Sequence, residues 1–248
     1  MTPGQPPVLE LRGVSKSYGA ARALVDVDLT IHGHEVVAVV GDNGAGKSTL
    51  VDVLTGTSAP DAGEVLVDGA PVPLASPAAA RALGIAGVFQ DLALCANLDV
   101  VENLFLGHEP TAAGLLDEVA MEKHAWRLLD QLAVRVASVR APVAALSGAQ
   151  RQAVAIARSL LGEPRVLVLD EPTASLGISQ TAEFLTLVER LRSRGHGVLL
   201  TSHSLVDVQA VADRIVVLRL GRTNGEFDGA TASYEDLLAA VTGVGVTR

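Results

Sequence analysis

The chain has 248 residues, of which 49% are hydrophobic, and it carries a formal net charge of −9. This length can bury one large core with a smaller inserted lobe, but hardly two full domains. The acidic balance argues against a nucleic-acid partner, because affinity for phosphate backbones depends on clustered Lys and Arg.

Nothing in the sequence indicates a membrane-spanning or secreted chain. The apolar runs, such as Val36–Val40, fall far short of the ~18 residues of a spanning helix. Met1–Val8 contains three prolines and no basic patch before an apolar stretch, unlike a secretory signal. The single cysteine, Cys95, cannot form an internal disulfide and fits a reducing compartment. We therefore expect a cytoplasmic protein.

The first third of the chain predicts a β layer followed by the start of an α/β core. Val8–Ile31 alternates apolar and polar residues, which predicts antiparallel strands with one buried face. The side chains expected on that face are Val25, Val27, Leu29 and Ile31. A β-branched run, Glu35–Val40, then leads through a glycine-rich turn into a helix at Ser48–Leu54. The next predicted elements are a strand at Glu64–Val67, a helix from Pro77 to Leu83 capped by Ser76, and a strand at Ile85–Phe89.

A helical lobe is predicted in the middle of the chain. Helix dominates from Asp99 to about Leu161, with an apolar stripe formed by Met121, Ala125, Leu128, Leu129 and Leu132. We take residues 91–160 as a lobe inserted into a core of residues 1–90 and 161–248, which together form a single domain. The α/β alternation then returns, with strands at Val166–Leu169 and Val198–Thr201, an intervening helix that carries Phe184, Leu187, Val188 and Leu191, and a helix from Ser204.

The glycine-rich turn carries the strongest functional motif. Gly41–Ser48 matches G-x-x-x-x-G-K-[ST] directly after a strand and before a helix, which is the context that this motif requires. Its glycines let backbone N–H groups and the helix N-terminus face a polyphosphate. Lys47 is expected to reach the β- and γ-phosphates of a nucleotide, and Ser48 to ligate Mg²⁺. An ordinary glycine-rich turn is the alternative, but it would leave Lys47 unexplained.

A pair of carboxylates follows the strand Val166–Leu169. Asp170 and Glu171 are therefore placed at the carboxyl edge of the sheet, where α/β proteins bind ligands. Asp170 suits Mg²⁺, and Glu171 suits a general base that polarises the attacking water. Alone, the pair would be read as a solvated helix cap; beside a phosphate-binding loop, the functional interpretation is favoured.

A third motif narrows the choice among P-loop ATPases and GTPases. Leu146–Gln150 reads Leu-Ser-Gly-Ala-Gln and resembles the L-S-G-G-Q signature of the ABC ATPase family, in which it contacts the ATP of a partner subunit. Ser147 and Gln150 also form a capping-box pattern, so a structural role is compatible. Ala149 replaces the second glycine of the signature and disfavours positive φ, which puts local geometry and turnover in doubt.

Other motifs of the family occur in order. Tyr18 stands where the family stacks an aromatic ring on adenine, although a core tyrosine is the alternative. Gln90 matches the Q-loop glutamine, which reaches Mg²⁺ and the attacking water; the alternative is a solvated loop residue. His203 matches the histidine near the γ-phosphate, although a lone histidine is more often structural.

The resemblance covers nearly the whole chain and implies its fold and site residues. The implied fold is a P-loop NTPase (RecA-like) α/β core with an antiparallel β subdomain and an inserted helical signature subdomain. The implied catalytic residues are Lys47, Gln90, Glu171 and His203. The implied metal ligands are Ser48, Gln90 and Asp170. The implied nucleotide contacts are Tyr18, Gly41, Asn43, Gly44, Ala45, Gly46, Lys47, Ser48, Thr49, Ser147, Gly148 and Gln150.

One departure indicates a branch of the family. After Glu171, most members continue to a motif that ends in Asp, whereas here it ends in Leu176-Gly177. With Phe89–Cys95 and Asn97–Asn103, this ending resembles the simple-sugar importers of ribose, xylose or fructose type. We therefore expect an ATPase subunit of an importer, with a different solute or a soluble non-transport ABC ATPase as alternatives.

The resemblance also implies partners. They are a second copy in a head-to-tail ATP sandwich, a membrane permease and, indirectly, an extracytoplasmic solute-binding protein, which would place the chain on the cytoplasmic face of the membrane. We expect the permease to dock at Asp91–Phe105, because this segment holds more apolar residues than a short loop and helix readily bury. They are Leu92, Leu94, Leu98, Val100, Val101, Leu104 and Phe105; packing of the lobe is the alternative.

Overall fold

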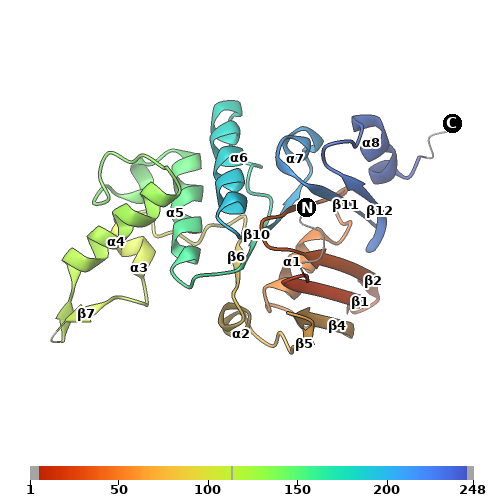
Figure 1. The fold of residues 1–248 in the computed structure, drawn as a ribbon, viewed down its shortest axis with the longest axis horizontal. Coiled ribbons are helices and arrows are strands. Elements are labelled where there is room, and N and C mark those ends of the chain that lie inside the picture. Colours follow the sequence, from red (N-terminus) through yellow and green to blue (C-terminus); the bar gives the residue numbers. More distant parts are fainter. Residues whose placement is uncertain (1–5, 113, 245–248) are drawn as a thin grey trace.

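The computed structural model of the chain describes residues 6–112 and 114–244 (Figure 1). Within these residues the strands form a four-stranded sheet, a six-stranded sheet and a two-stranded hairpin. Figure 1 shows the two larger sheets together on one side of the molecule, while a lobe of helices extends on the other. The predicted α/β fold with an antiparallel β layer is confirmed.

The four-stranded sheet is the antiparallel layer that the alternating sequence predicted. Its order is β2-β1-β4-β5, and β1 pairs with both β2 and β4. Leu9, Leu11 and Ile31 are buried on its inner face. The strands are β1 (Leu9–Tyr18), β2 (Ala21–Ile31), β4 (Ala62–Val67) and β5 (Ala70–Pro71).

A bulge at Asp26 interrupts the alternation predicted for β2. Between the pairings of Val27 and Leu24, β2 advances three residues while β1 advances two. Asp26 takes a left-handed φ of 55°, and the extra residue exchanges the two faces of the strand. Leu24 is consequently buried, whereas Val25 is only half-buried. The predicted buried face is right for Val27 and wrong for Val25.

The six-stranded sheet forms the centre of the core. Its order is β12-β11-β3-β10-β9-β6; five strands run parallel, and β12 is antiparallel at one edge. Three predicted strands match β6, β9 and β10 to within one residue. The strands are β3 (Val36–Val40), β6 (Ile85–Val88), β9 (Val166–Leu169), β10 (Gly197–Ser202), β11 (Arg214–Arg219) and β12 (Arg222–Asp228).

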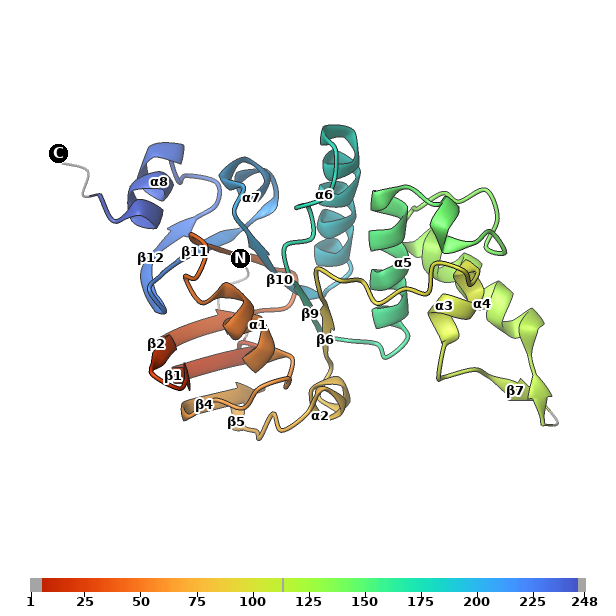
Figure 2. The same ribbon diagram turned by 180° about the vertical axis from the view of Figure 1, so that it is seen from behind.

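Both faces of this sheet are covered, which explains the continuous apolar run in β3. Val36, Ala38 and Val40 pack in a cluster with residues of α6 and α7, whereas Val37 and Val39 pack in a cluster with α1 and the antiparallel layer. Figure 2 shows α1 beside β1 and β2 on that second face. The helices of the core are α1 (Lys47–Leu54), α2 (Pro77–Ala82), α6 (Ile178–Ser193), α7 (Leu205–Val211) and α8 (Tyr234–Thr242).

The helical lobe contains α3 (Val100–Phe105), α4 (Glu118–Gln131), a 3₁₀ turn (Val143–Ala145) and α5 (Gly148–Leu160). A short hairpin of β7 (Thr111–Ala112) and β8 (Leu115–Leu116), which the sequence did not predict, extends from it. The predicted apolar stripe is confirmed, because its members Met121, Ala125, Leu128, Leu129 and Leu132 are all buried.

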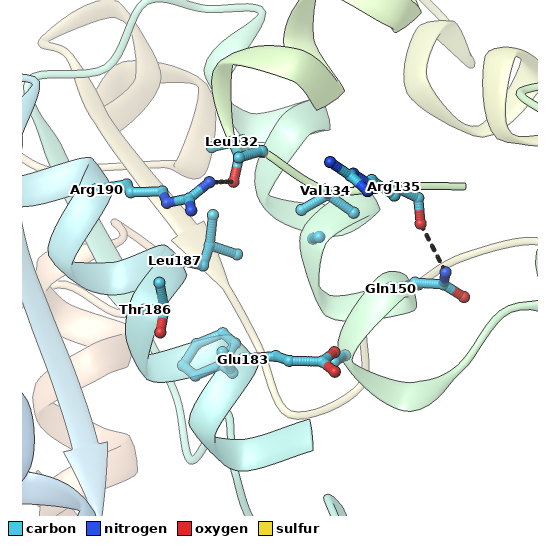
Figure 3. A pocket seen from close by; sticks show the side chains of 12 residues that line it. Leu132, Val134, Arg135, Gln150, Glu183, Thr186, Leu187 and Arg190 are labelled. Carbon is cyan, nitrogen blue, oxygen red and sulfur yellow. Dashed lines mark hydrogen bonds between the residues drawn. The ribbon is translucent and has the colours of Figure 1, made fainter. Parts of the chain in front are cut away.

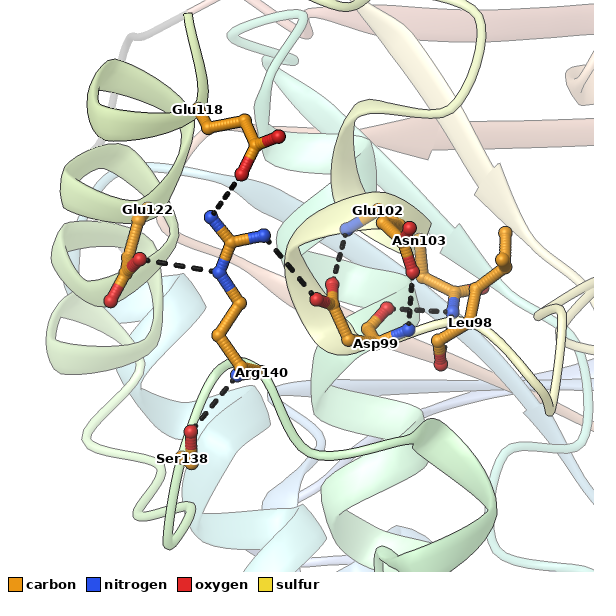
Figure 4. A network of polar contacts seen from close by, with 8 residues as sticks. All are labelled: Leu98, Asp99, Glu102, Asn103, Glu118, Glu122, Ser138 and Arg140. Carbon is orange, nitrogen blue, oxygen red and sulfur yellow. Dashed lines mark hydrogen bonds and ion pairs between the residues drawn. The ribbon is translucent and has the colours of Figure 1, made fainter.

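Arg140 forms ion pairs with several elements of the lobe (Figure 4). Its guanidinium lies 3.1 Å from a carboxylate oxygen of Glu118, 3.2 Å from one of Glu122 and 3.5 Å from one of Asp99. Asp99 in turn caps α3 in a capping box with Glu102. One cation therefore joins the start of α4, the start of α3 and the loop that leads to α5.

Most of the apolar residues expected to form a docking surface after Gln90 are core residues. Val100, Val101, Leu104 and Phe105 are buried against α4 and α5, and Leu92 and Leu94 pack partly buried against the same cluster. The alternative, that these residues pack the lobe, holds for α3. The apolar count therefore does not identify an exposed surface at Asp91–Phe105.

None of the helices within the described residues is long and apolar enough to span a bilayer. The absence of a secretory signal was expected from Met1–Val8, of which Met1–Gln5 lies outside the described residues.

Candidate functional site

The phosphate-loop motif connects β3 to α1 through a closely packed turn. Gly46 has a φ of 110°, and a Cβ atom there would lie 2.5 Å from the carbonyl oxygen of Ala23. Only glycine fits both that conformation and that approach of two backbones. The Lys47 side chain is 6% exposed, and its ammonium donates to the carbonyl oxygens of Gly41 at 2.9 Å and Asp42 at 3.3 Å. The lysine side chain therefore folds back onto the backbone of the phosphate loop.

Three residues from distant parts of the sequence meet beside this lysine. One carboxylate oxygen of Glu171 lies 3.5 Å from Lys47 Nζ, and the other lies 2.8 Å from His203 Nδ1. Glu171 follows β9 and His203 follows β10, and these neighbouring parallel strands end at the same edge of the sheet. The structure therefore brings Lys47, Glu171 and His203 together.

The backbone at Glu171 has a left-handed φ of 43°, which is uncommon outside glycine. Its N–H donates to Thr201 Oγ1 at 2.9 Å, and the same hydroxyl donates to Asp170 Oδ1 at 2.7 Å. Thr201 is fully buried in β10. In the sequence, Thr201 stands out only as the end of a predicted strand. The available signal for a further role was a hydroxyl at a strand end, next to a strand that ends in two carboxylates.

A further carboxylate, Asp52, lies near Asp170 and was also missed. Burial raises the pKa of the Asp52 carboxyl above its usual range, and the negative charge of Asp170 raises it further. Asp52 stands four residues after Ser48 on α1, so both share one face of that helix. That spacing was the signal available in the sequence. The local excess of negative charge suits a cation.

Tyr18 and Gln90 are both exposed. The Tyr18 side chain, at the end of β1, is 50% exposed, and so it is not a core tyrosine. Lys16 Nζ lies 5.6 Å from the centre of its ring and is anchored by the carbonyl oxygen of Ala59 and by Asp61. Gln90 lies two residues beyond the end of β6.

Ser147–Gln150 begins α5 with the predicted capping box. Ser147 Oγ accepts from the Gln150 N–H at 3.2 Å, and the Gln150 side chain accepts from the Ser147 N–H at 2.9 Å. A Cβ at position 148 would lie 2.7 Å from both Leu176 Cδ2 and Gln180 Oε1, so a larger residue would displace these two side-chain ends. Ala149 is an ordinary helical residue and has no positive φ, so the replacement imposes no backbone strain there, while its effect on turnover stays a prediction.

This segment lies apart from the phosphate loop of its own chain. Figures 1 and 2 both show α5 separated from α1 by the strands of the six-stranded sheet. One hydrogen bond connects α5 to the chain directly after Glu171. Gln152 Nε2, on α5, donates to the carbonyl oxygen of Pro172 at 2.9 Å. The structure therefore does not bring Ser147, Gly148 and Gln150 together with Lys47.

A cavity of about 380 Å³ lies between α5, α6 and the loop after α4 (Figure 3). Arg190 of α6 donates to the carbonyl oxygen of Leu132 at 3.1 Å, and Gln150 donates to that of Arg135 at 2.8 Å. The first bond joins the core to the lobe, whereas the second lies within the lobe. The residues of the phosphate loop do not line this cavity.

A second cavity, of about 430 Å³, lies between the helical lobe and β6. Four of its lining residues are arginines or histidines and none is acidic. They are Arg81, His108, His124 and Arg158. Arg158 also donates to the carbonyl oxygens of Leu92 and Ala93, each at 2.8 Å, and so connects this cavity to the segment after Gln90.

Comparison with known proteins gives a consistent result. The family profile described as ABC transporter matches residues 24–174. A xylose/arabinose import ATP-binding protein of Sulfolobus acidocaldarius is 42% identical over 87% of this chain and 86% of its own length. A fructose import ATP-binding protein of Rhizobium meliloti is 39% identical over 96% of this chain and 95% of its own length.

Other relatives are longer. A ribose import ATP-binding protein of Rubrobacter xylanophilus is 43% identical over 96% of this chain but only 47% of its own length, so the chain spans about half of that relative. Among solved structures, the ADP conformation of an ATP-binding cassette of an ABC transporter has a TM-score of 0.81 at 25% identity, covering 96% of each chain. A dimeric bacterial ABC transporter cassette has a TM-score of 0.74 at 25% identity, covering 90% of this chain and all of that one.

Proposed function

Because the chain belongs to the ABC transporter family, we propose that it is the ATP-binding and ATP-hydrolysing subunit of an importer for a simple sugar. The observation that carries the ATPase assignment is the meeting of Lys47, Glu171 and His203 at one edge of the sheet. The sugar assignment rests on relatives named for the import of fructose, ribose, and xylose or arabinose.

The residues present fit ATP with Mg²⁺. Ser48, Asp170 and the nearby Asp52 offer oxygen donors and negative charge, which is what Mg²⁺ prefers. Among the described residues no three His, Cys, Asp or Glu side chains form a ready metal cage, and a magnesium site completed by substrate phosphates needs none. When bound, Mg²⁺ neutralises charge on the phosphates. Gln90 is proposed to complete the metal shell from its exposed loop.

Residues of the chain itself bind the phosphates and the adenine and accept the proton of the attacking water. Lys47 exchanges its carbonyl partners for phosphate oxygens, while backbone N–H groups of Gly41–Thr49 cradle the polyphosphate. Glu171 accepts the proton of the attacking water, and His203, 2.8 Å away, orients that carboxylate. Tyr18 offers an exposed ring face on which adenine can stack.

We propose that two copies are needed for hydrolysis. The start of α5 lies apart from the phosphate loop of its own chain, while its capped N-terminus suits an anion. In a head-to-tail pair, Ser147, Gly148 and Gln150 of one copy would contact the ATP held by the other. The dimeric cassette among similar solved structures supports this arrangement.

The permease is proposed to dock at the cavity between the lobe and β6 rather than on the apolar face of α3. The arginines and histidines that line this cavity suit a partner segment with an acidic residue. Because Arg158 holds the loop after Gln90, movement there can reach the nucleotide site. This attachment would place the chain on the cytoplasmic face of the membrane, with the solute-binding protein on the other side.

The test is ATP hydrolysis by the purified chain, followed by sugar uptake in cells that contain it with its permease. We expect MgATP-dependent phosphate release and uptake of ribose, xylose or fructose that is lost when the chain is deleted. Arg81→Glu with His108→Glu should keep phosphate release but abolish uptake and co-purification with the permease, whereas Leu116→Asp on the hairpin should not. An active chain that co-purifies with no permease from cells would favour a soluble ABC ATPase, and uptake of an unrelated solute would overturn the sugar assignment.

A further inference from the structure

Thr201 lies near the end of β10, two residues before His203, and contacts both Asp170 and Glu171. Thr201 is fully buried, and its strand β10 lies between β3 and β9 in the sheet. Leu200 pairs with Leu169, so that Thr201 stands opposite Asp170 where β9 ends. The hydroxyl of Thr201 is thereby placed at the point where the chain leaves the sheet toward Glu171.

This hydroxyl makes two hydrogen bonds of different kinds. It donates to Asp170 Oδ1 at 2.7 Å, which fixes the rotation of the carboxylate and leaves Oδ2 as the oxygen free to face a cation. It also accepts from the backbone N–H of Glu171 at 2.9 Å. That N–H lies beyond the last paired residue of β9, and so a side chain replaces the strand partner.

The second bond stabilises an unusual backbone. Glu171 has a φ of 43°, a conformation that surrounding contacts must enforce in a residue with a Cβ. Two residues after Thr201, His203 contacts the Glu171 carboxylate at 2.8 Å. The end of β10 therefore holds Glu171 at two points: the backbone through Thr201 and the side chain through His203.

We propose that Thr201 is a positioning residue for ATP hydrolysis, which sets the orientation of Asp170 toward Mg²⁺ and the place of the Glu171 carboxylate. The inference rests on the proposed ATPase function. A valine here would fill the same space but could neither donate to Asp170 nor accept from Glu171, whereas a serine could do both.

The experiment compares Thr201→Val and Thr201→Ser with the wild-type chain. Hydrolysis is measured against ATP and against Mg²⁺, and thermal unfolding is followed in parallel. Thr201→Val should lower kcat and raise the Mg²⁺ concentration for half-maximal activity, by about 10- to 100-fold in one or both, as for other residues that orient metal ligands. The KM for ATP at saturating Mg²⁺ should change far less, and Thr201→Ser should restore most of kcat.

A matched control separates this role from the loss of any buried hydroxyl. Thr55 is also buried, and its Oγ1 donates to the carbonyl oxygen of Val51 at 2.8 Å within α1. Thr55→Val should lower the melting temperature while leaving the Mg²⁺ requirement unchanged. If Thr201→Val does not fold, Thr201→Ala tests the same loss without placing a methyl group where the hydroxyl was.

Each outcome decides the proposal. A Thr201→Val protein with wild-type kcat and Mg²⁺ requirement overturns it, as does an equal loss in Thr201→Ser. A change in melting temperature alone, as in Thr55→Val, would make Thr201 a purely structural residue. A wild-type chain without ATPase activity would instead overturn the proposed function.

Discussion

His203 Nδ1 lies 2.8 Å from one carboxylate oxygen of Glu171, and the other oxygen lies 3.5 Å from Lys47 Nζ. The carboxylate thus bridges the ends of β10 and the phosphate loop. Because it sits between a cation and an imidazole, its position depends on both. Substitutions of Lys47 and of Glu171 should therefore have distinct effects.

Lys47→Ala should weaken MgATP binding and lower turnover by at least about 100-fold, as expected when a group that stabilises transition-state charge is removed. The buried ammonium is the cation that the structure holds over the loop. Nucleotide binding and phosphate release check this. Lys123→Ala, on the exposed face of α4, serves as the control. ATP affinity within twofold of the wild type would contradict the role.

Glu171→Gln should keep ATP binding but lower hydrolysis by about 10²–10⁴, because an amide cannot accept the proton of water. With hydrolysis blocked, the ATP-bound protein should accumulate as a dimer, whereas with ADP it should stay monomeric. Light scattering under both nucleotides measures this. Phosphate release at the wild-type rate would exclude Glu171 as the base, and a monomer under both nucleotides would count against the head-to-tail pair.

Tyr18→Ala should raise the KM for ATP more than it lowers kcat, since stacking of a base on an aromatic ring contributes about 1–3 kcal/mol. Tyr18→Phe keeps the ring and should retain the wild-type KM. Steady-state kinetics of both variants provide the check. If the alanine variant keeps the wild-type KM, adenine does not stack on this exposed ring.

Ala149→Gly should lower the free energy of unfolding by up to about 1 kcal/mol, because Ala149 is an ordinary helical residue and glycine is less favourable in a helix. Denaturant unfolding measures the difference. A gain in stability would show instead that the methyl group strains the start of α5.

Arg140→Ala should destabilise the helical lobe, because Asp99, Glu118 and Glu122 would lose the cation they share (Figure 4). Each exposed ion pair is worth about 0–1 kcal/mol, and the loss should shrink at high salt. Arg140→Lys should recover part of the stability. Thermal unfolding at low and high salt tests both variants, and an unchanged melting temperature at low salt would mean that the network contributes nothing.

Sequence alone determined much of the fold, because its signals are local. The capping box of Ser147 and Gln150, the buried strand Val166–Leu169 and the apolar stripe of α4 depend on residues close together in the chain. The phosphate loop is likewise a contiguous motif with a strand before it and a helix after it. These predictions needed no long-range information.

Tertiary structure decided what depends on neighbours far apart in sequence. The bulge at Asp26 arises from pairing with β1, and it determines that Leu24 rather than Val25 lies on the buried face. Burial of the apolar residues of α3 follows from its contacts with α4 and α5 rather than from their number.

The same holds for the site. Asp52 and Thr201 are 118 and 31 residues from Asp170 by their numbers in the sequence, and only the packing of α1 and β10 beside β9 brings them to it. The phosphate-loop motif and the paired carboxylates, both visible in the sequence, predicted binding of a phosphate and a cation. Which side chains hold Asp170 and Glu171 in place was decided by the order of the strands in the sheet, because neighbours in a parallel sheet are set by topology and not by position along the chain.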